Sequence, residues 1–193
     1  MDEQARNKSY ADPHALLLGQ PFALGKYHQE ILATWIATKL MVCEFSVPED
    51  VVTPPLERSL LMGRRLAPDI MKIWIGYYQG SFWSSAYERH ASLLGWGDAS
   101  GPFPLPKDAP AKTIQSQTLG IGKALVHAMS TTLKGLDFNS RRLPNNPLRQ
   151  IWPYERNFLW PSGQTITDPQ VRLISSGLEQ FTRTLRFSPG SLV

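Results

Sequence analysis

The chain opens with two stretches whose apolar residues recur at helical spacing. In residues 27–45, large apolar side chains recur every three or four positions and small ones fill the remaining turns, with no glycine or proline. This pattern predicts a largely buried helix. A second helix is predicted over residues 54–66, because the Pro54-Pro55 pair suits a first turn and leucines follow it at helical spacing.

The middle of the chain changes to patterns typical of strands. Residues 71–78 are β-branched and aromatic and predict a strand, with residues 81–91 as its antiparallel partner. Residues 118–129 alternate large and small side chains. This period of two favours a single strand whose small face lies under a helix, and a helix beginning near Gly120 is the alternative.

The last third combines a loop-rich stretch with a helix. Residues 144–161 hold several prolines and aromatic residues and predict loops. The final helix is predicted from Thr167, which suits an N-cap, to about residue 185, with Pro169 inside the first turn. Its apolar stripe comprises Val171, Ile174, Leu178, Phe181 and Leu185.

These elements predict an α+β fold. An N-terminal helical pair packs against a small, mainly antiparallel sheet, and a C-terminal amphipathic helix covers one face. Residues 1–96 hold the helical pair and the first strands, and residues 97–112 form a linker or loop rich in proline and glycine. Residues 113–193 are a basic portion of strands, loops and a helix, which we expect to complete one compact domain with residues 1–96.

Composition narrows the class of protein. The 193 residues include a single cysteine, Cys43, which excludes an internal disulfide and fits a reducing compartment. The N-terminus has no apolar stretch behind a basic one, and the longest apolar stretch, residues 31–45, is too short and too polar to span a bilayer. We therefore expect a cytoplasmic protein with no membrane partner and no cofactor.

The charge distribution is polarised along the chain. Residues 1–100 carry 9 Lys/Arg and 11 Asp/Glu, whereas residues 101–193 carry 11 Lys/Arg and 5 Asp/Glu. Basic residues beside exposed aromatic residues are typical of nucleic-acid binding, and a solvated surface is the alternative. The predicted binding residues are Arg141, Arg142, Arg149 and Arg156, with Trp152 and Trp160 as stacking surfaces.

The residues offer few candidates for catalysis. None of the four histidines has a spacing typical of metal ligands, and residues 120–123 do not complete a phosphate-binding loop. Cys43 lies in a predicted apolar helix, where a nucleophile is not expected. We expect no metal site.

Several short segments, in order, resemble the C-terminal region of bacterial and phage HNH endonuclease-like proteins. They are ILATW (31–35), IWIGYYQG (73–80), QSQT (115–118), GKALVHA (122–128), LRQIWP (148–153), WP (160–161) and TITDPQV (165–171). The resemblance extends from about residue 15 to residue 185. It implies a non-catalytic region, because in that family the zinc cysteines and the HNH active site lie upstream of the segments matched here.

Three function classes follow. The first is a non-enzymatic binding protein that engages nucleic acid, or a host nucleoprotein complex, through the arginine-rich C-terminal half. The second is an anti-defence inhibitor of phage or mobile-element type, such as an anti-CRISPR protein, that acts by protein–protein contact. The third is a divergent metal-dependent nuclease of HNH type, for which His127 and Asn139 are the weak catalytic candidates. A chain that folds but has lost its function is a further alternative.

Overall fold

The computed structural model describes residues 13–94, 112–133, 136 and 147–186, which form an α+β fold. Its helices are α2 (Pro13–Leu18), α3 (Lys26–Cys43), α4 (Pro55–Arg64), α5 (Asp168–Ser175) and α6 (Gly177–Arg186), with 3₁₀ turns η1 (Glu44–Ser46) and η2 (Pro48–Asp50). Its strands are β1 (Phe22–Leu24), β2 (Met71–Tyr78), β3 (Tyr87–Ser92), β4 (Ile114–Ile121), β5 (Ala124–Thr131), β6 (Arg149–Trp152), β7 (Phe158–Trp160) and β8 (Thr165–Ile166). The predicted fold class is confirmed.

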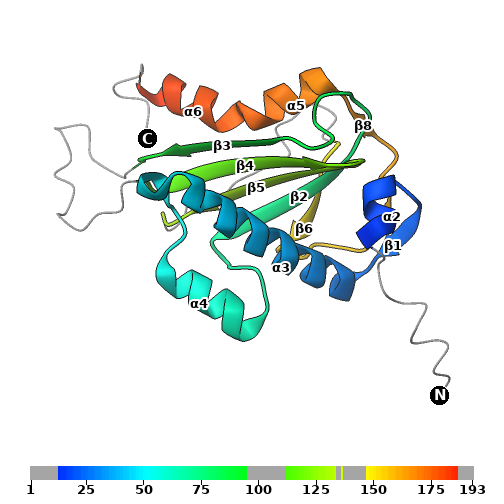
Figure 1. Cartoon of the computed structure of the whole chain (residues 1–193), viewed down its shortest axis with the longest axis horizontal. Helices are drawn as coiled ribbons and strands as arrows, with labels where there is room; N and C mark the ends of the chain where they lie inside the picture. The colour runs from blue at the N-terminus through cyan, green and yellow to red at the C-terminus, as the bar shows by residue number, and fades with distance from the viewer. Residues whose placement is uncertain (1–12, 95–111, 134–135, 137–146, 187–193) are drawn as a thin grey trace.

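Six strands form the central sheet. Its order is β3-β4-β5-β2-β6, and β8 also pairs with β2. Every pair is antiparallel except β2 and β8, which run parallel. Strands β1 and β7 form a separate antiparallel ribbon. The sheet is therefore mainly antiparallel, as predicted, with α3 and α4 on one side of it and α5 and α6 on the other (Figure 1).

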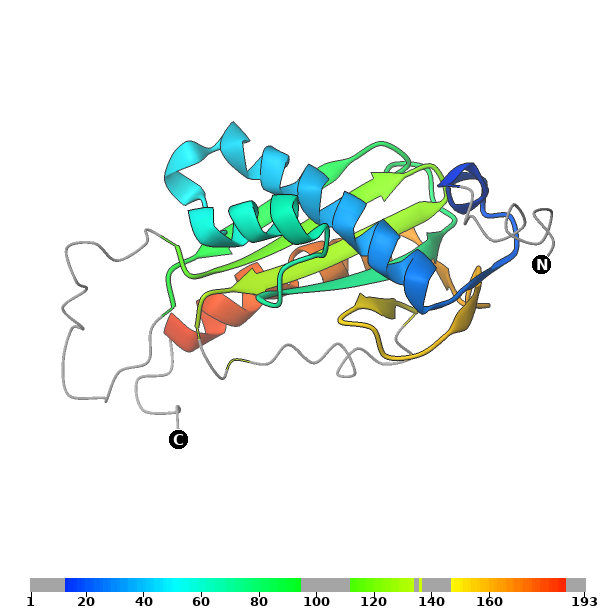
Figure 2. The same ribbon diagram turned by 90° about the horizontal axis from the view of Figure 1, so that it is seen from below.

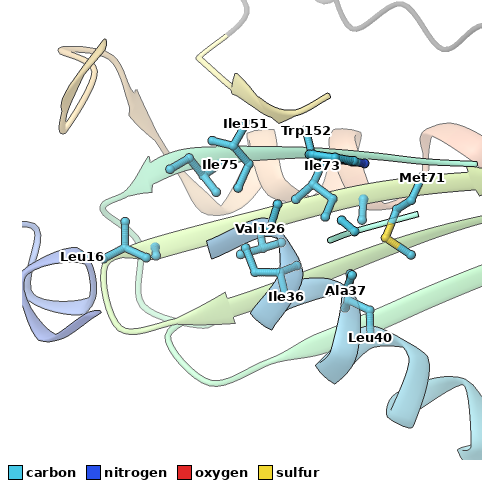
Figure 3. Close-up of a cluster of buried hydrophobic side chains, with 14 of the residues drawn as sticks. Leu16, Ile36, Ala37, Leu40, Met71, Ile73, Ile75, Val126, Ile151 and Trp152 are labelled. Carbon is cyan, nitrogen blue, oxygen red and sulfur yellow. The ribbon is translucent and has the colours of Figure 1, made fainter. Parts of the chain in front are cut away.

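Helix α3 crosses one face of the sheet, with α4 beside its C-terminal half (Figure 2). Alternate residues of β2 point to this face, and Ile73 and Ile75 belong there to one buried cluster with Ile36 and Leu40 of α3 (Figure 3). The Ala124, Val126 and Ala128 side chains of β5 belong to the same core cluster. The prediction that the small face of residues 118–129 lies under a helix is thus confirmed for β5.

Helix α5 covers the opposite face. The other residues of β2, including Trp74 and Tyr78, form a second buried cluster there with Leu125 of β5 and with Val171 and Ile174 of α5. The sheet therefore has two buried faces, which explains why β2 is apolar almost without interruption.

The predicted partner of residues 71–78 is wrong. Strand β5, not residues 81–91, pairs with β2 along its length, and β3 begins at Tyr87 and pairs with β4. The cause is Asp168 at the start of α5, whose carboxylate accepts hydrogen bonds from the N–H groups of Ser81 (3.1 Å) and Phe82 (3.3 Å) and from the Tyr78 hydroxyl. These bonds turn the chain away from β2 before β3 starts.

Two further predicted elements are each divided in two. Residues 118–129 form the hairpin of β4 and β5 rather than one strand or a helix, because Gly122 adopts a left-handed φ of 57° and turns the chain. The final helix is broken at Ser176 into α5 and α6. Its predicted start is confirmed, since the Gln170 side-chain oxygen accepts the Thr167 N–H at 2.9 Å.

The predicted linker, residues 97–112, lies outside the described residues except for Lys112, so the domain boundaries stay a prediction. Residues 147–161, predicted as loop, contain β6 and β7. Of the helices that the structure describes, none combines the length and the apolar character needed to cross a bilayer.

Candidate functional site

The predicted binding arginines lie in different settings. Arg141 and Arg142 are outside the described residues, as is Asn139. Arg149 is half-buried on β6, and Arg156 is exposed in the connection between β6 and β7. Among these arginines, Arg156 is therefore the one that the described structure presents to solvent.

Trp152 and Trp160 are not stacking surfaces, and this prediction is wrong. Both indoles are buried in the core beneath α3. Trp152 donates its ring N–H to the Pro68 carbonyl at 2.9 Å, and Trp160 packs edge-on against Tyr77 at 5.9 Å between ring centroids. Strands β6 and β7 direct these rings inward, so neither presents an exposed face on which a base could stack.

His127 is buried on the face of the sheet that α5 covers. Its Nδ1 is 2.9 Å from the Thr118 hydroxyl, and its ring lies 6.0 Å from that of Trp74 on the neighbouring strand. Burial lowers the pKa of His127 to about 4, because the charged imidazolium is poorly solvated there. The ring is therefore neutral near pH 7 and closed to solvent, an arrangement typical of a packed structural histidine.

We predict that this histidine makes the fold acid-sensitive. The unfolded chain takes up a proton near the ordinary pKa of 6.5 and the folded chain only near 4, so stability is lost as the pH falls through this interval. The expected loss is on the order of 3 kcal/mol. Urea unfolding at about pH 7.5 and pH 4.5 measures it. The His127→Gln variant should lose less stability over the same interval, and an equal loss would contradict the assignment.

The outer face of α3 carries a feature that the sequence prediction missed. Its inner face is packed on the sheet, yet Tyr27, Ile31, Trp35 and Val42 are exposed on the opposite side, from 45% for Trp35 to 65% for Val42. Intervals of four and seven residues place them along one line of the helix. We call these four side chains the outer ridge. The prediction of a largely buried helix therefore holds for the inner face only.

Two threonines beside the outer ridge have their hydroxyl groups satisfied by the helix itself. The Thr34 hydroxyl donates to the Glu30 carbonyl at 2.7 Å, and the Thr38 hydroxyl donates to the Thr34 carbonyl at 2.8 Å. Since these hydroxyls already have protein partners, covering the ridge would strand neither of them. Dehydrating these two hydroxyls therefore carries little cost.

Cationic side chains border the outer ridge. Lys39 lies over the Trp35 ring, with its Nζ 5.9 Å from the ring centroid. On the other side, the Arg65 carbonyl accepts a hydrogen bond of 3.1 Å from Thr34, which brings this exposed arginine alongside α3. At the N-terminal end, Lys26 lies 5.9 Å from the centre of the Tyr154 ring.

The connection between β6 and β7 is anchored to the start of α3. The buried Gln29 side chain donates to the carbonyls of Leu24 (2.7 Å) and Arg156 (2.9 Å), and the Tyr154 hydroxyl donates to Asn157 at 3.0 Å. Arg156 is thereby held near the N-terminal end of the outer ridge. The sequence could not indicate this, because the contact joins residues far apart in the chain.

A buried charge cluster lies under the C-terminal end of α3. Glu44 is fully buried and pairs with Arg58 of α4 at 2.5 Å. Its carboxylate also accepts hydrogen bonds from the Thr53 hydroxyl (2.6 Å), the Thr53 N–H (3.2 Å) and the Gln115 amide. Every lone-pair direction is used internally, so this cluster fastens α3, α4 and β4 together and has no open position for a substrate.

Neither a group of metal ligands among the described residues nor a match to a known protein adds a further candidate. Within the described residues, no three His, Cys, Asp or Glu side chains gather as metal ligands would. Comparison of the chain with protein-family models, curated proteins and solved structures gave no significant match. The candidate site therefore rests on the geometry of the outer ridge and its border.

Proposed function

We propose that this protein is a non-enzymatic binding protein, related to the C-terminal region of HNH endonuclease-like proteins, that engages a nucleic-acid-handling complex by protein–protein contact. The observation that carries the proposal is the outer ridge. A helix packed on a sheet normally turns its polar side to water, whereas α3 also carries four exposed large apolar side chains on its outer side. A line of exposed tryptophan, tyrosine and aliphatic side chains is characteristic of surfaces that bind a partner.

Protein contact suits the ridge better than nucleic acid does. Ile31 and Val42 have no π-face on which a base could stack, so half of the ridge offers nothing to a nucleic-acid strand. The tryptophans expected to stack are buried. The apolar centre with a basic border instead matches the usual arrangement of a protein interface.

If the outer ridge binds a protein partner, placing one charge at its centre should abolish that binding. Tagged protein is incubated with nuclease-treated bacterial lysate, and captured proteins are quantified by mass spectrometry. The Trp35→Asp variant should reduce recovery of the partner at least about tenfold, since a central aromatic anchor commonly contributes more than 1.4 kcal/mol to binding. Leu173→Asp, an exposed residue on the α5 side of the sheet, serves as the matched control. Identical captured sets for the wild type and the Trp35→Asp variant would refute the proposal.

Direct nucleic-acid binding is a second candidate, favoured by Lys26 at the start of α3 and by Tyr154 and Arg156 in the adjoining connection between β6 and β7. Fluorescence anisotropy with a labelled single-stranded oligonucleotide tests this candidate. Binding should weaken steeply with salt, and reversal of Lys26 and Arg156 to glutamate should abolish it. Binding that is absent at low salt would exclude this candidate and leave the protein-contact proposal unaffected.

A further inference from the structure

Two cations near the outer ridge, Lys39 and Arg65, have no acidic partner among the described residues. Within the described structure, no carboxylate lies within ion-pair distance of Lys39, Arg64 or Arg65. Lys26 has one, since its Nζ is 3.9 Å from Glu30. Lys39 follows Trp35 by one turn of the helix and the backbone of the exposed Arg65 adjoins Thr34, so both cations stand close to the apolar line.

We infer that the ridge docks into a protein groove that is apolar along its floor and lined with Asp and Glu at its rim. The inference rests on the proposed function and names the partner's chemistry. A helix face with anchors at intervals of four and seven residues fits a hydrophobic groove. Acidic residues at the rim would meet Lys39 and Arg65 in a partly desolvated setting, where opposite charges fix the orientation and the partner choice.

The length of the ridge sets the length of the groove. Fifteen residues separate Tyr27 from Val42, which corresponds to about 22 Å along a helix axis. Trp35 lies near the middle of this span, where the energetically dominant residue of an interface is usually found. We therefore assign Trp35 as the central anchor, with Tyr27 and Val42 near the two ends of the groove.

Charge reversal distinguishes this inference from the proposed function. The partner is first defined as the protein lost from nuclease-treated lysate with Trp35→Asp but kept with Leu173→Asp. The Lys39→Glu/Arg65→Glu variant is then compared with Lys123→Glu, an exposed lysine in the turn between β4 and β5. The double reversal should lower recovery of that partner at least tenfold at low salt, and Lys123→Glu should not. Lysine substitutions of the partner's rim acids should restore binding of the reversed variant.

Other outcomes would overturn either the acidic rim alone or the proposed function with it. If Trp35→Asp loses a partner that the double reversal retains, the acidic rim is wrong and the proposed function stands. If Trp35→Asp loses no partner, both are wrong. Sedimentation with vesicles of phosphatidylglycerol and phosphatidylcholine, and anisotropy with a single-stranded oligonucleotide, test the other anionic surfaces. Binding to either that Trp35→Asp abolishes, in the absence of a protein partner, would overturn the groove.

Discussion

The Arg58→Met variant should lower the free energy of unfolding by about 3 kcal/mol, since removing one partner of a buried ion pair leaves the other charge uncompensated. Glu44 has no access to water, whereas the Arg58 side chain is 19% exposed. The guanidinium group also donates to the carbonyls of Met41 (2.9 Å) and Thr53 (3.2 Å). Its loss therefore releases the C-terminal end of α3, the segment before α4 and a buried carboxylate together.

A double-mutant cycle in urea isolates the ion pair. Glu44→Gln combined with Arg58→Met should be less destabilised than the sum of the two single variants, because the double variant buries no charge. Arg64→Met is the matched control. It removes an exposed arginine from the same helix and should change stability by no more than about 0.5 kcal/mol. Strict additivity of the Glu44 and Arg58 substitutions would show that the pair is not coupled.

Elements whose signals are local were predicted well. Strand β2 has the predicted bounds of residues 71–78. The bounds of α3 and α4 match the predicted ranges, residues 27–45 and 54–66, to within one residue at the start and two at the end. In each, the apolar period is sustained and a proline or glycine punctuates the end. The capped start of α5 belongs to the same class, because the cap involves residues only three apart.

Elements fixed by distant contacts were predicted poorly. Residues 81–91 have the composition of a strand, but the carboxylate of Asp168 holds their beginning in a turn. Trp152 and Trp160 lie in a loop-like sequence, yet the short strands β6 and β7 direct both rings into the core. Periodicity cannot report such contacts, because it averages over neighbours in the chain and not over neighbours in space.

The apolar pattern of residues 27–45 reports the inner face of α3 and the outer ridge together. Apolar residues all round a helix indicate that both sides are covered, and the sequence alone suggested that the protein's own core covers them. The described structure covers one side only. The charge distribution along the chain likewise predicted a binding surface in the C-terminal half. In the structure, a cation near an exposed aromatic ring is Lys39, which belongs to α3 in the N-terminal half.

The Gly120→Ala variant should destabilise the protein by about 3 kcal/mol, at the upper end of the usual range for overpacking. A methyl group at residue 120 would lie 1.5 Å from the Trp83 carbonyl oxygen. The obstacle is backbone and cannot rotate away, because Gly120 N–H donates to the Ala86 carbonyl and Gly122 N–H to the Ser84 carbonyl, both at 2.8 Å. The added methyl must therefore separate β4 from the segment that crosses it.

Gly63→Ala is the matched control for this clash. Gly63 lies in α4 with no atom within 4 Å of an added Cβ, so alanine should be tolerated or should stabilise the helix by about 0.5–1 kcal/mol. Urea unfolding of both variants compares the same chemical change at a closed and an open position. A Gly120→Ala variant as stable as the wild type would mean that residues 83–86 do not cross β4 at this distance. The hydrogen bonds that hold Gly120 and Gly122 against that segment would then need to be reassigned.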